Sequence, residues 1–270
     1  MDRVEAPASR VRANLLLGIL GVICVVAVGV SFWPNDSVQT TATTTSQPLP
    51  PKPATIDGWT PYWVLERVLQ QPDSGISRFE DLREVSPFWF SVSGFDAIEQ
   101  DTFTPDDLAA TYIAQLRDAG VAIVPSLLDR MDAGQMATIL SDPVVRSAHV
   151  AAIREFADQF DVDGSDIDYE QFAFADDPAT WSTTRPNWVK FIRELSTVLH
   201  SDGRTLSVSI PAVYDERVTG DPGYWVYDHG AIAQHVDALR IMAYDYSVAE
   251  PGPIAPLEWV EQVIDGVLLA

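Results

Sequence analysis

The chain has 270 residues, of which 47% are hydrophobic, so it is long enough for one large domain or two modest ones with a sizeable core. Asp and Glu total 39 against 17 Lys and Arg, a formal net charge of −22. This acidity argues against nucleic acid as a partner, because nucleic-acid binding needs a basic surface. The single cysteine excludes an internal disulfide.

Residues 1–13 carry three arginines and precede an uncharged apolar run, LLLGILGVICVVAVGVSFW, from Leu15 to Trp33. About 19 residues at 1.5 Å each span roughly 30 Å, the thickness of a hydrocarbon core. No Lys or Arg follows until Lys52, so the positive-inside rule places residues 1–13 in the cytoplasm. We predict a single-pass membrane anchor over residues 14–33 with the remainder outside the cell; a cleaved signal peptide and a secreted protein are the alternative.

Residues 34–54 are rich in Thr, Ser and Pro, so we expect a flexible linker. A globular domain, residues 55–270, follows, in which short apolar runs alternate with amphipathic patterns. The predicted strands cover 59–64, 85–92, 121–128, the acidic stretch near 163–170, 205–213 and 238–246; the predicted helices cover 104–120, 141–160, 187–203 and 255–269. This alternation indicates an α/β fold with a parallel sheet, either doubly wound or a barrel. No Gly-rich phosphate loop follows the first strand, which weakens a nucleotide-binding version.

The most informative stretch is FDVDGSDIDYEQFAF, Phe160 to Phe174. On a strand, Asp166, Asp168 and Glu170 share one face, with neighbouring carboxylates roughly 6.6 Å apart. At an effective dielectric constant of ~20, each adjacent ionised pair repels by about 2.5 kcal/mol, so at least one pKa should rise. An exposed edge strand and a calcium-binding loop are the alternatives; the flanking helices that a calcium loop of the helix-loop-helix type requires are missing from the pattern.

Two motifs resemble those of glycoside hydrolase family 18, in its branch of bacterial cell-wall and spore-cortex hydrolases. DGSDIDYE, Asp163 to Glu170, is similar to the D-x-x-D-x-D-x-E signature, and RIMAYDY, Arg240 to Tyr246, is similar to the M-x-Y-D motif on the sixth strand. The resemblance implies a TIM (β/α)8-type barrel, here truncated after about six strands, with the site at the carboxyl ends of the strands. It implies no metal or cofactor.

The resemblance also implies roles for single residues. Glu170 is the general acid, and the nucleophile is the N-acetyl carbonyl of the substrate itself. Asp168 orients the acetamido group and shares a proton with Asp166, while Tyr244 donates a hydrogen bond to the acetamido oxygen. The expected substrate-binding residues are Asp163, which also supports its strand, Met242, Asp245 and Trp89. Core packing is expected for most of the other aromatic residues on the early strands.

The expected function is therefore hydrolysis of β-1,4-linked N-acetylglucosamine polymers, chitin or the glycan of peptidoglycan, by an exported retaining enzyme. An inactive, lectin-like sugar-binding barrel is the alternative, and a structural wall protein is a weaker one. The chain departs from the family pattern in two places. Strands seven and eight are missing after residue 270, which predicts a fragment, and strand three reads VPSLLD where many relatives have a Ser-x-Gly-Gly turn.

Overall fold

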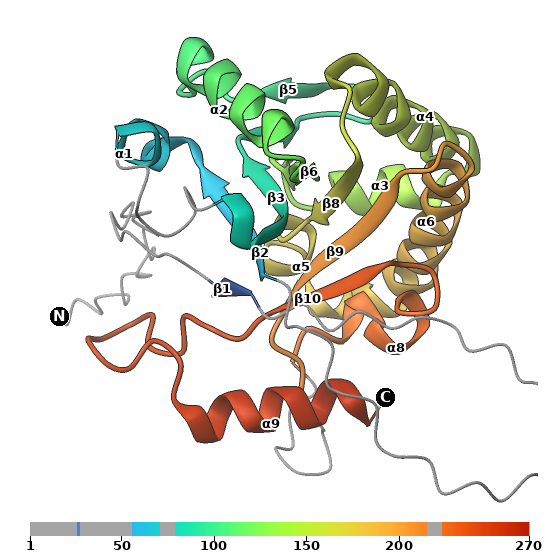
Figure 1. The fold of residues 1–270 in the computed structure, drawn as a ribbon. Coiled ribbons are helices and arrows are strands. Elements are labelled where there is room, and N and C mark those ends of the chain that lie inside the picture. The colour runs from blue at the N-terminus through green and yellow to red at the C-terminus, as the bar shows by residue number, and fades with distance from the viewer. Residues whose placement is uncertain (1–25, 28–55, 71–78, 215–222, 270) are drawn as a thin grey trace, which may run out of the picture.

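The computed structural model describes residues 26–27, 56–70, 79–214 and 223–269. Its centre is a row of parallel strands in chain order, with helices packed along the outer side (Figure 1). The strands of this row are β2 (Ile56–Pro61), β3 (Leu82–Phe88), β4 (Phe90–Val92), β6 (Ala122–Ile123), β7 (Ser126–Asp129), β8 (Gly164–Asp168), β9 (Thr205–Pro211) and β10 (Ala238–Met242).

Two members of the row are interrupted strands. β3 pairs with β2 and β6, whereas β4, which follows after Trp89, pairs with β7. Val124 and Pro125 separate β6 from β7, and proline has no N–H to give to a ladder. The row therefore has six parallel members, β2, β3/β4, β6/β7, β8, β9 and β10, as the alternating pattern predicted.

The row curves into a barrel that is not closed, which confirms the truncated barrel expected from the family resemblance. β2 and β10 lie at its two ends, and no ladder joins them in the described part of the chain. Two short strands pair antiparallel with the row: β1 (Val26–Ala27) with β2, and β5 (Ile98–Gln100) with β4.

Most helices lie along the outer side of the row between consecutive strands, and α9 follows the last strand (Figure 1). Their bounds are α1 (Leu65–Gln70), α2 (Asp106–Asp118), α3 (Gln135–Ser141), α4 (Pro143–Phe160), α5 (Gln171–Phe174), α6 (Trp181–Ser201), α8 (His229–Ile232) and α9 (Leu257–Leu268), with 3₁₀ turns at Tyr62–Val64, Phe79–Asp81, Pro178–Thr180 and Trp225–Tyr227. Among the described residues, no helix is both long and apolar enough to cross a bilayer. The predicted anchor, residues 14–33, lies outside them apart from β1.

Several element ends follow local rules, and others correct the predictions. α4 starts as predicted, with the carboxylate of Asp142 accepting hydrogen bonds from two amides of its first turn at 2.8 and 3.2 Å. α2 starts at Asp106 without a cap from Thr104, whose buried hydroxyl finds no partner among the described residues. The predicted strand 59–64 ends at Pro61. α6 starts at Trp181, well before residue 187, because it continues through Pro186.

The two faces of each strand meet different surroundings. On β9, Leu206, Val208 and Ile210 belong to the apolar core shared with the outer helices. Ser207 and Ser209 alternate with them and make their hydrogen bonds to Asp166 inside the barrel. The interior is therefore polar, and the helix-facing layer provides the apolar core.

Candidate active site

The acidic strand β8 has the two faces that its period-2 pattern predicted. Tyr169 points toward the helices: its ring stacks on Phe191 of α6 with centroids 6.0 Å apart, and its hydroxyl lies 2.9 Å from Nε2 of His149 on α4. Asp166 points the other way, into the barrel. All of β8 is buried, so the exposed edge strand is excluded, and the segment between α4 and α5 is a strand of the sheet, not a calcium-binding loop.

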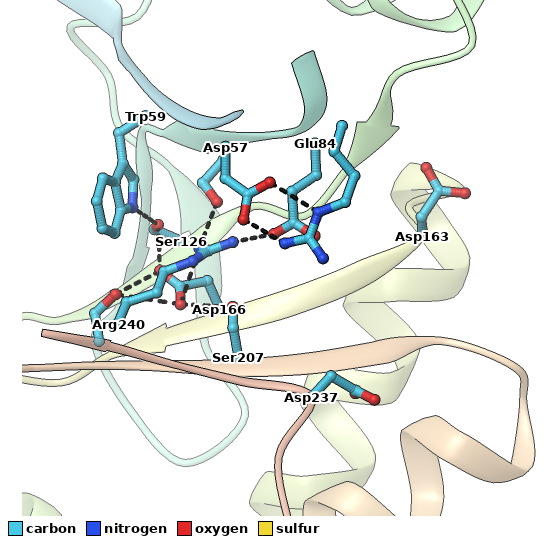
Figure 2. Close-up of polar contacts among 12 residues, drawn as sticks. Asp57, Trp59, Glu84, Ser126, Asp163, Asp166, Ser207, Asp237 and Arg240 are labelled. Carbon is cyan, nitrogen blue, oxygen red and sulfur yellow. Dashed lines mark hydrogen bonds and ion pairs between the residues drawn. The ribbon is translucent and has the colours of Figure 1, made fainter. Parts of the chain in front are cut away.

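Asp166 is held from three strands (Figure 2). Ser126 of β7 donates to Oδ2 at 2.7 Å, and Ser207 of β9 donates to Oδ1 at 2.7 Å. Ser209 lies within 3.0 and 3.2 Å of the two oxygens, and Nη1 of Arg240 from β10 lies 3.1 Å from Oδ1. Among the described residues, the hydrogen-bond partners of the Asp166 carboxylate are serines, and none of its bonds reaches Asp168.

Arg240 crosses the barrel interior and balances two acids. Its guanidinium pairs with Glu84 and donates to Ser86 at 2.7 Å, both on β3, in addition to its contact with Asp166. The carbon Cζ lies 5.2 Å from the ring centroid of Trp59 on β2. Burial raises the pKa of Glu84, and the positive charge of Arg240 opposes that rise. The site floor is therefore a buried layer of ion pairs and hydrogen bonds centred on Arg240 (Figure 2).

Asp168 is the next acid on the same face, one layer nearer the carboxyl end of the barrel. It is buried, and its Oδ1 has no hydrogen-bond partner among the described residues. Burial raises its pKa well above the usual value, and the negative charges of Glu170 and Asp166 add to the effect. A buried carboxyl oxygen without a donor is costly, so this atom is suited to a donor on a ligand.

Glu170 lies two residues beyond the end of β8 and is only partly buried. Burial raises its pKa from 4.5 to about 7, with further upward contributions from the charges of Asp129 and Asp245. A carboxylic acid that keeps its proton near neutral pH can act as a general acid. Burial and neighbouring negative charges thus raise the pKa of both Asp168 and Glu170.

The end of β10 brings the second motif to the same place. Met242 ends the strand, and Tyr244 lies beyond it, with a pKa raised by burial and by the charges of Asp168 and Glu170. Asp245 is exposed and has the left-handed backbone angle φ 60°, a sparsely populated state for a non-glycine residue. The two sequence motifs therefore meet at the carboxyl end of the barrel, as predicted.

Two predicted substrate contacts are not at this site. Asp163 lies before β8, at the amino end, where its Oδ2 accepts the amide of Ile123 at 2.8 Å; Figure 2 shows it apart from the Arg240 network. Its position corresponds to the strand-supporting role. Trp89 is 1% exposed and packs in the core against Phe90, so it offers no face for a sugar ring to stack on.

Comparison with known proteins identifies the fold and family. The sequence model of the glycosyl hydrolases family 18 matches residues 94–265. The chain belongs to this family. It is 31% identical over 129 residues to YdhD of Bacillus subtilis (strain 168), which is named as a sporulation-specific glycosylase; the match covers 47% of this chain and 28% of YdhD.

Solved structures share the barrel fold of this chain. The chitinase from Chromobacterium violaceum ATCC 12472 matches with a TM-score of 0.60 and 21% identity, over 78% of this chain and 63% of that one. The Bacillus cereus spore cortex-lytic enzyme SleL matches with a TM-score of 0.61 and 18% identity, over 79% of this chain and 47% of that one. The chain therefore spans less than two thirds of the length of each of these three relatives.

Several residues of this family 18 site were missed from the sequence. Arg240 could have been identified from the sequence, because a charged residue two positions before Met242 lies on the same strand face as Met242. Ser207 and Ser209 could have been identified from the alternation of polar and apolar residues in TLSVSIP. Asp129 ends β7, and in a barrel the carboxyl ends of neighbouring strands meet at one rim.

Proposed function

We propose that this chain is a glycosidase that hydrolyses β-1,4-linked N-acetylglucosamine polymers, chitin or the glycan strand of peptidoglycan. Family membership supports a glycoside hydrolase. The observation that supports the proposed substrate and mechanism is that Asp168 and Glu170, on one face of the barrel, have different surroundings. One acid is buried with an unpartnered oxygen, and the other is at the rim and holds its proton near neutral pH.

In the proposed first step, Glu170 gives its proton to the glycosidic oxygen as the bond from that oxygen to C1 breaks. The carbonyl oxygen of the substrate's own acetamido group attacks C1 from the opposite face and forms a cyclic oxazolinium ion. In this proposal Tyr244 donates a hydrogen bond to that acetamido oxygen. Oδ1 of Asp168 accepts a hydrogen bond from the acetamido N–H, and the absence of another partner for this oxygen among the described residues supports that role.

The positive charge of the oxazolinium favours the ionised form of Asp168, whose pKa is high in the free chain. Asp166 is the neighbouring carboxylate on this face, and serine hydroxyls that donate to it can rotate to accept. A proton passed from Asp168 toward Asp166 would leave the negative charge next to the oxazolinium.

In the second step, a water molecule attacks C1 while the ionised carboxylate of Glu170 takes one of its protons. The oxazolinium opens to restore the acetamido group, and Glu170 is again protonated. The anomeric configuration is retained because C1 is inverted twice.

The test is product analysis by mass spectrometry after the chain is incubated separately with chitin oligomers and with purified peptidoglycan. Cleavage of either polymer at N-acetylglucosamine, with retained configuration by NMR, is the expected result. Binding of chitin oligomers without cleavage would instead show a lectin-like barrel. The proposal would be refuted if the chain neither bound nor cleaved either polymer.

We also propose that the chain is exported and anchored in the cell membrane by residues 14–33. Support comes from the uncharged run, the arginines ahead of it and the Thr- and Pro-rich linker behind it. Membrane fractionation and protease treatment of intact cells test this. Carbonate-resistant membrane association with a protease-accessible domain is expected; a domain protected in intact cells would contradict it.

A further inference from the structure

Asp129, the last residue of β7, holds the start of the segment that carries Glu170. Its Oδ1 accepts the amide N–H groups of Glu170 and Gln171, each at 2.8 Å, and its Oδ2 accepts that of Phe172 at 2.9 Å. Asp129 is 6% exposed, so these bonds lie away from bulk water. Three charge-assisted hydrogen bonds to consecutive amides fix the backbone of this turn from a neighbouring strand.

The turn has no cap of its own. α5 is four residues long, and Glu170, at its N-cap position, makes no side-chain capping bond. The orphan amides at a helix start need acceptors, and here one carboxylate from another strand accepts three of them. The direction in which Glu170 leaves the backbone therefore depends on Asp129.

The negative charge of Asp129 also raises the pKa of Glu170, and it does so more than the charge of Asp245. Burial raises the pKa of Asp129 itself to about 6, against the effect of the three amides. The other titratable groups that face Glu170 are Asp168 on β8, Tyr227 on the turn after β9 and Tyr244 beyond β10. Among them, Asp129 is the group that both touches the Glu170 backbone and bears on its proton.

We propose that Asp129 is the positioning residue of the general acid: it fixes the backbone from which Glu170 projects, and its charge holds the proton on Glu170. This proposal rests on the proposed function of Glu170. Ser126 to Asp129 stand where the resemblance puts a Ser-x-Gly-Gly turn, and the Gly at the position of Asp129 has no side chain that could accept these amides.

The first test is Asp129→Asn, which removes the charge and keeps one carbonyl oxygen for the amides. We expect kcat on a chitin oligomer to fall about 10- to 100-fold with KM nearly unchanged. We also expect the alkaline limb of the kcat profile to move down by about one pH unit. An unmoved limb in a folded variant would overturn the electrostatic part of the proposal.

Asp129→Glu separates the two roles, because it keeps the charge and displaces the acceptor oxygens. The expected result is a lower kcat with the alkaline limb near its original pH, and wild-type kcat would overturn the positioning part. Asp237→Asn is the matched control. Asp237 accepts the Leu206 amide at 2.8 Å before β10, at the amino end of the barrel, so its loss should leave the alkaline limb in place.

A substrate-free measurement keeps this test independent of the proposed function. The Glu170 carboxyl can be titrated by ¹³C NMR in labelled wild-type chain and in Asp129→Asn, assigned with Glu170→Gln. A downward shift in Asp129→Asn supports the coupling even if no polymer is cleaved. An equal midpoint in the two chains refutes it, whatever the activity.

Discussion

Nη1 of Arg240 on β10 lies 3.1 Å from Oδ1 of Asp166 on β8, and both side chains are nearly inaccessible to solvent. The same guanidinium pairs with Glu84 on β3. A single cation thus joins strands two, four and six of an open barrel through its interior. The acids Asp166, Asp168 and Glu170 follow one another along the barrel from these ion pairs toward the rim. We therefore expect the structure of the site to depend on Arg240.

Arg240→Met leaves Asp166 buried without its cation and leaves Glu84 with Arg83 alone, whose Nη2 lies 3.7 Å from Oε2 of Glu84. Removing one partner of a buried ion pair costs about 3–5 kcal/mol, so the free energy of unfolding should fall by that order. Chemical denaturation monitored by tryptophan fluorescence measures it. Arg154→Met is the control, because Arg154 is half exposed in its pair with Asp202 and its loss should cost about 1 kcal/mol or less. Equal losses in the two variants would contradict the assignment.

Gly164→Ala tests how closely β8 and β9 approach. A Cβ at Gly164 would lie 2.2 Å from Oγ1 and 2.5 Å from the carbonyl oxygen of Thr205, so backbone has to move. We expect a loss of about 2 kcal/mol in the free energy of unfolding. At Gly94 the nearest atom to an added Cβ is Cβ of Ala97 at 3.5 Å, so Gly94→Ala should change stability by about 0.5 kcal/mol or less. Melting curves of the two variants measure these changes in stability. A wild-type curve for Gly164→Ala would show that β8 and β9 are farther apart than in this structure.

The pH dependence of activity follows from Glu170. A general acid works only in its protonated form, and the pKa of Glu170 is raised to about 7. We therefore expect kcat to fall as pH rises through about 7. A kcat profile measured from pH 4 to 9 tests this, and activity that stays constant up to pH 9 would rule out Glu170 as the titrating acid.

The same pKa makes stability depend on pH. Between pH 4.5 and about 7 the folded chain binds more protons at Glu170 than the unfolded chain, so stability falls as pH rises through this window. Glu170→Gln removes this contribution. The loss of unfolding free energy between pH 4 and pH 8 should be smaller in Glu170→Gln than in wild type by ~2 kcal/mol. Glu155→Gln, on the exposed side of α4, should match wild type, and an identical loss in all three chains would contradict the raised pKa.

The period-2 pattern explains how much of the site was predictable. Asp166, Asp168 and Glu170 alternate with apolar partners, so their common face follows from strand geometry alone. The place of Glu170 at the rim and the approach of Tyr244 followed from the barrel that the two motifs implied. The order of the six strands followed from the alternation of apolar runs and helical patterns.

Contacts between distant segments were not predictable in this way. Arg240 and Glu84 are 156 residues apart, and Asp129 lies 41 residues before Glu170; no local pattern pairs them. Trp89 was misassigned because an aromatic residue on a strand has the same local signature in a core as at a sugar-binding surface. Asp163 was wrongly expected to contact the substrate because the motif spans the whole of β8. Asp163 lies at the amino end of that strand, and the site lies at the carboxyl end.

The most direct test of Glu170 as general acid is the dependence of kcat/KM on the leaving group. Aryl β-glycosides of chitobiose with phenols of decreasing pKa need progressively less protonation as the bond breaks. Wild type should show a shallow dependence, whereas Glu170→Gln should lose about 10²- to 10⁴-fold with poor leaving groups and approach wild type with the best one. An equal loss in Glu170→Gln across the whole series, or no loss at all, would contradict the account.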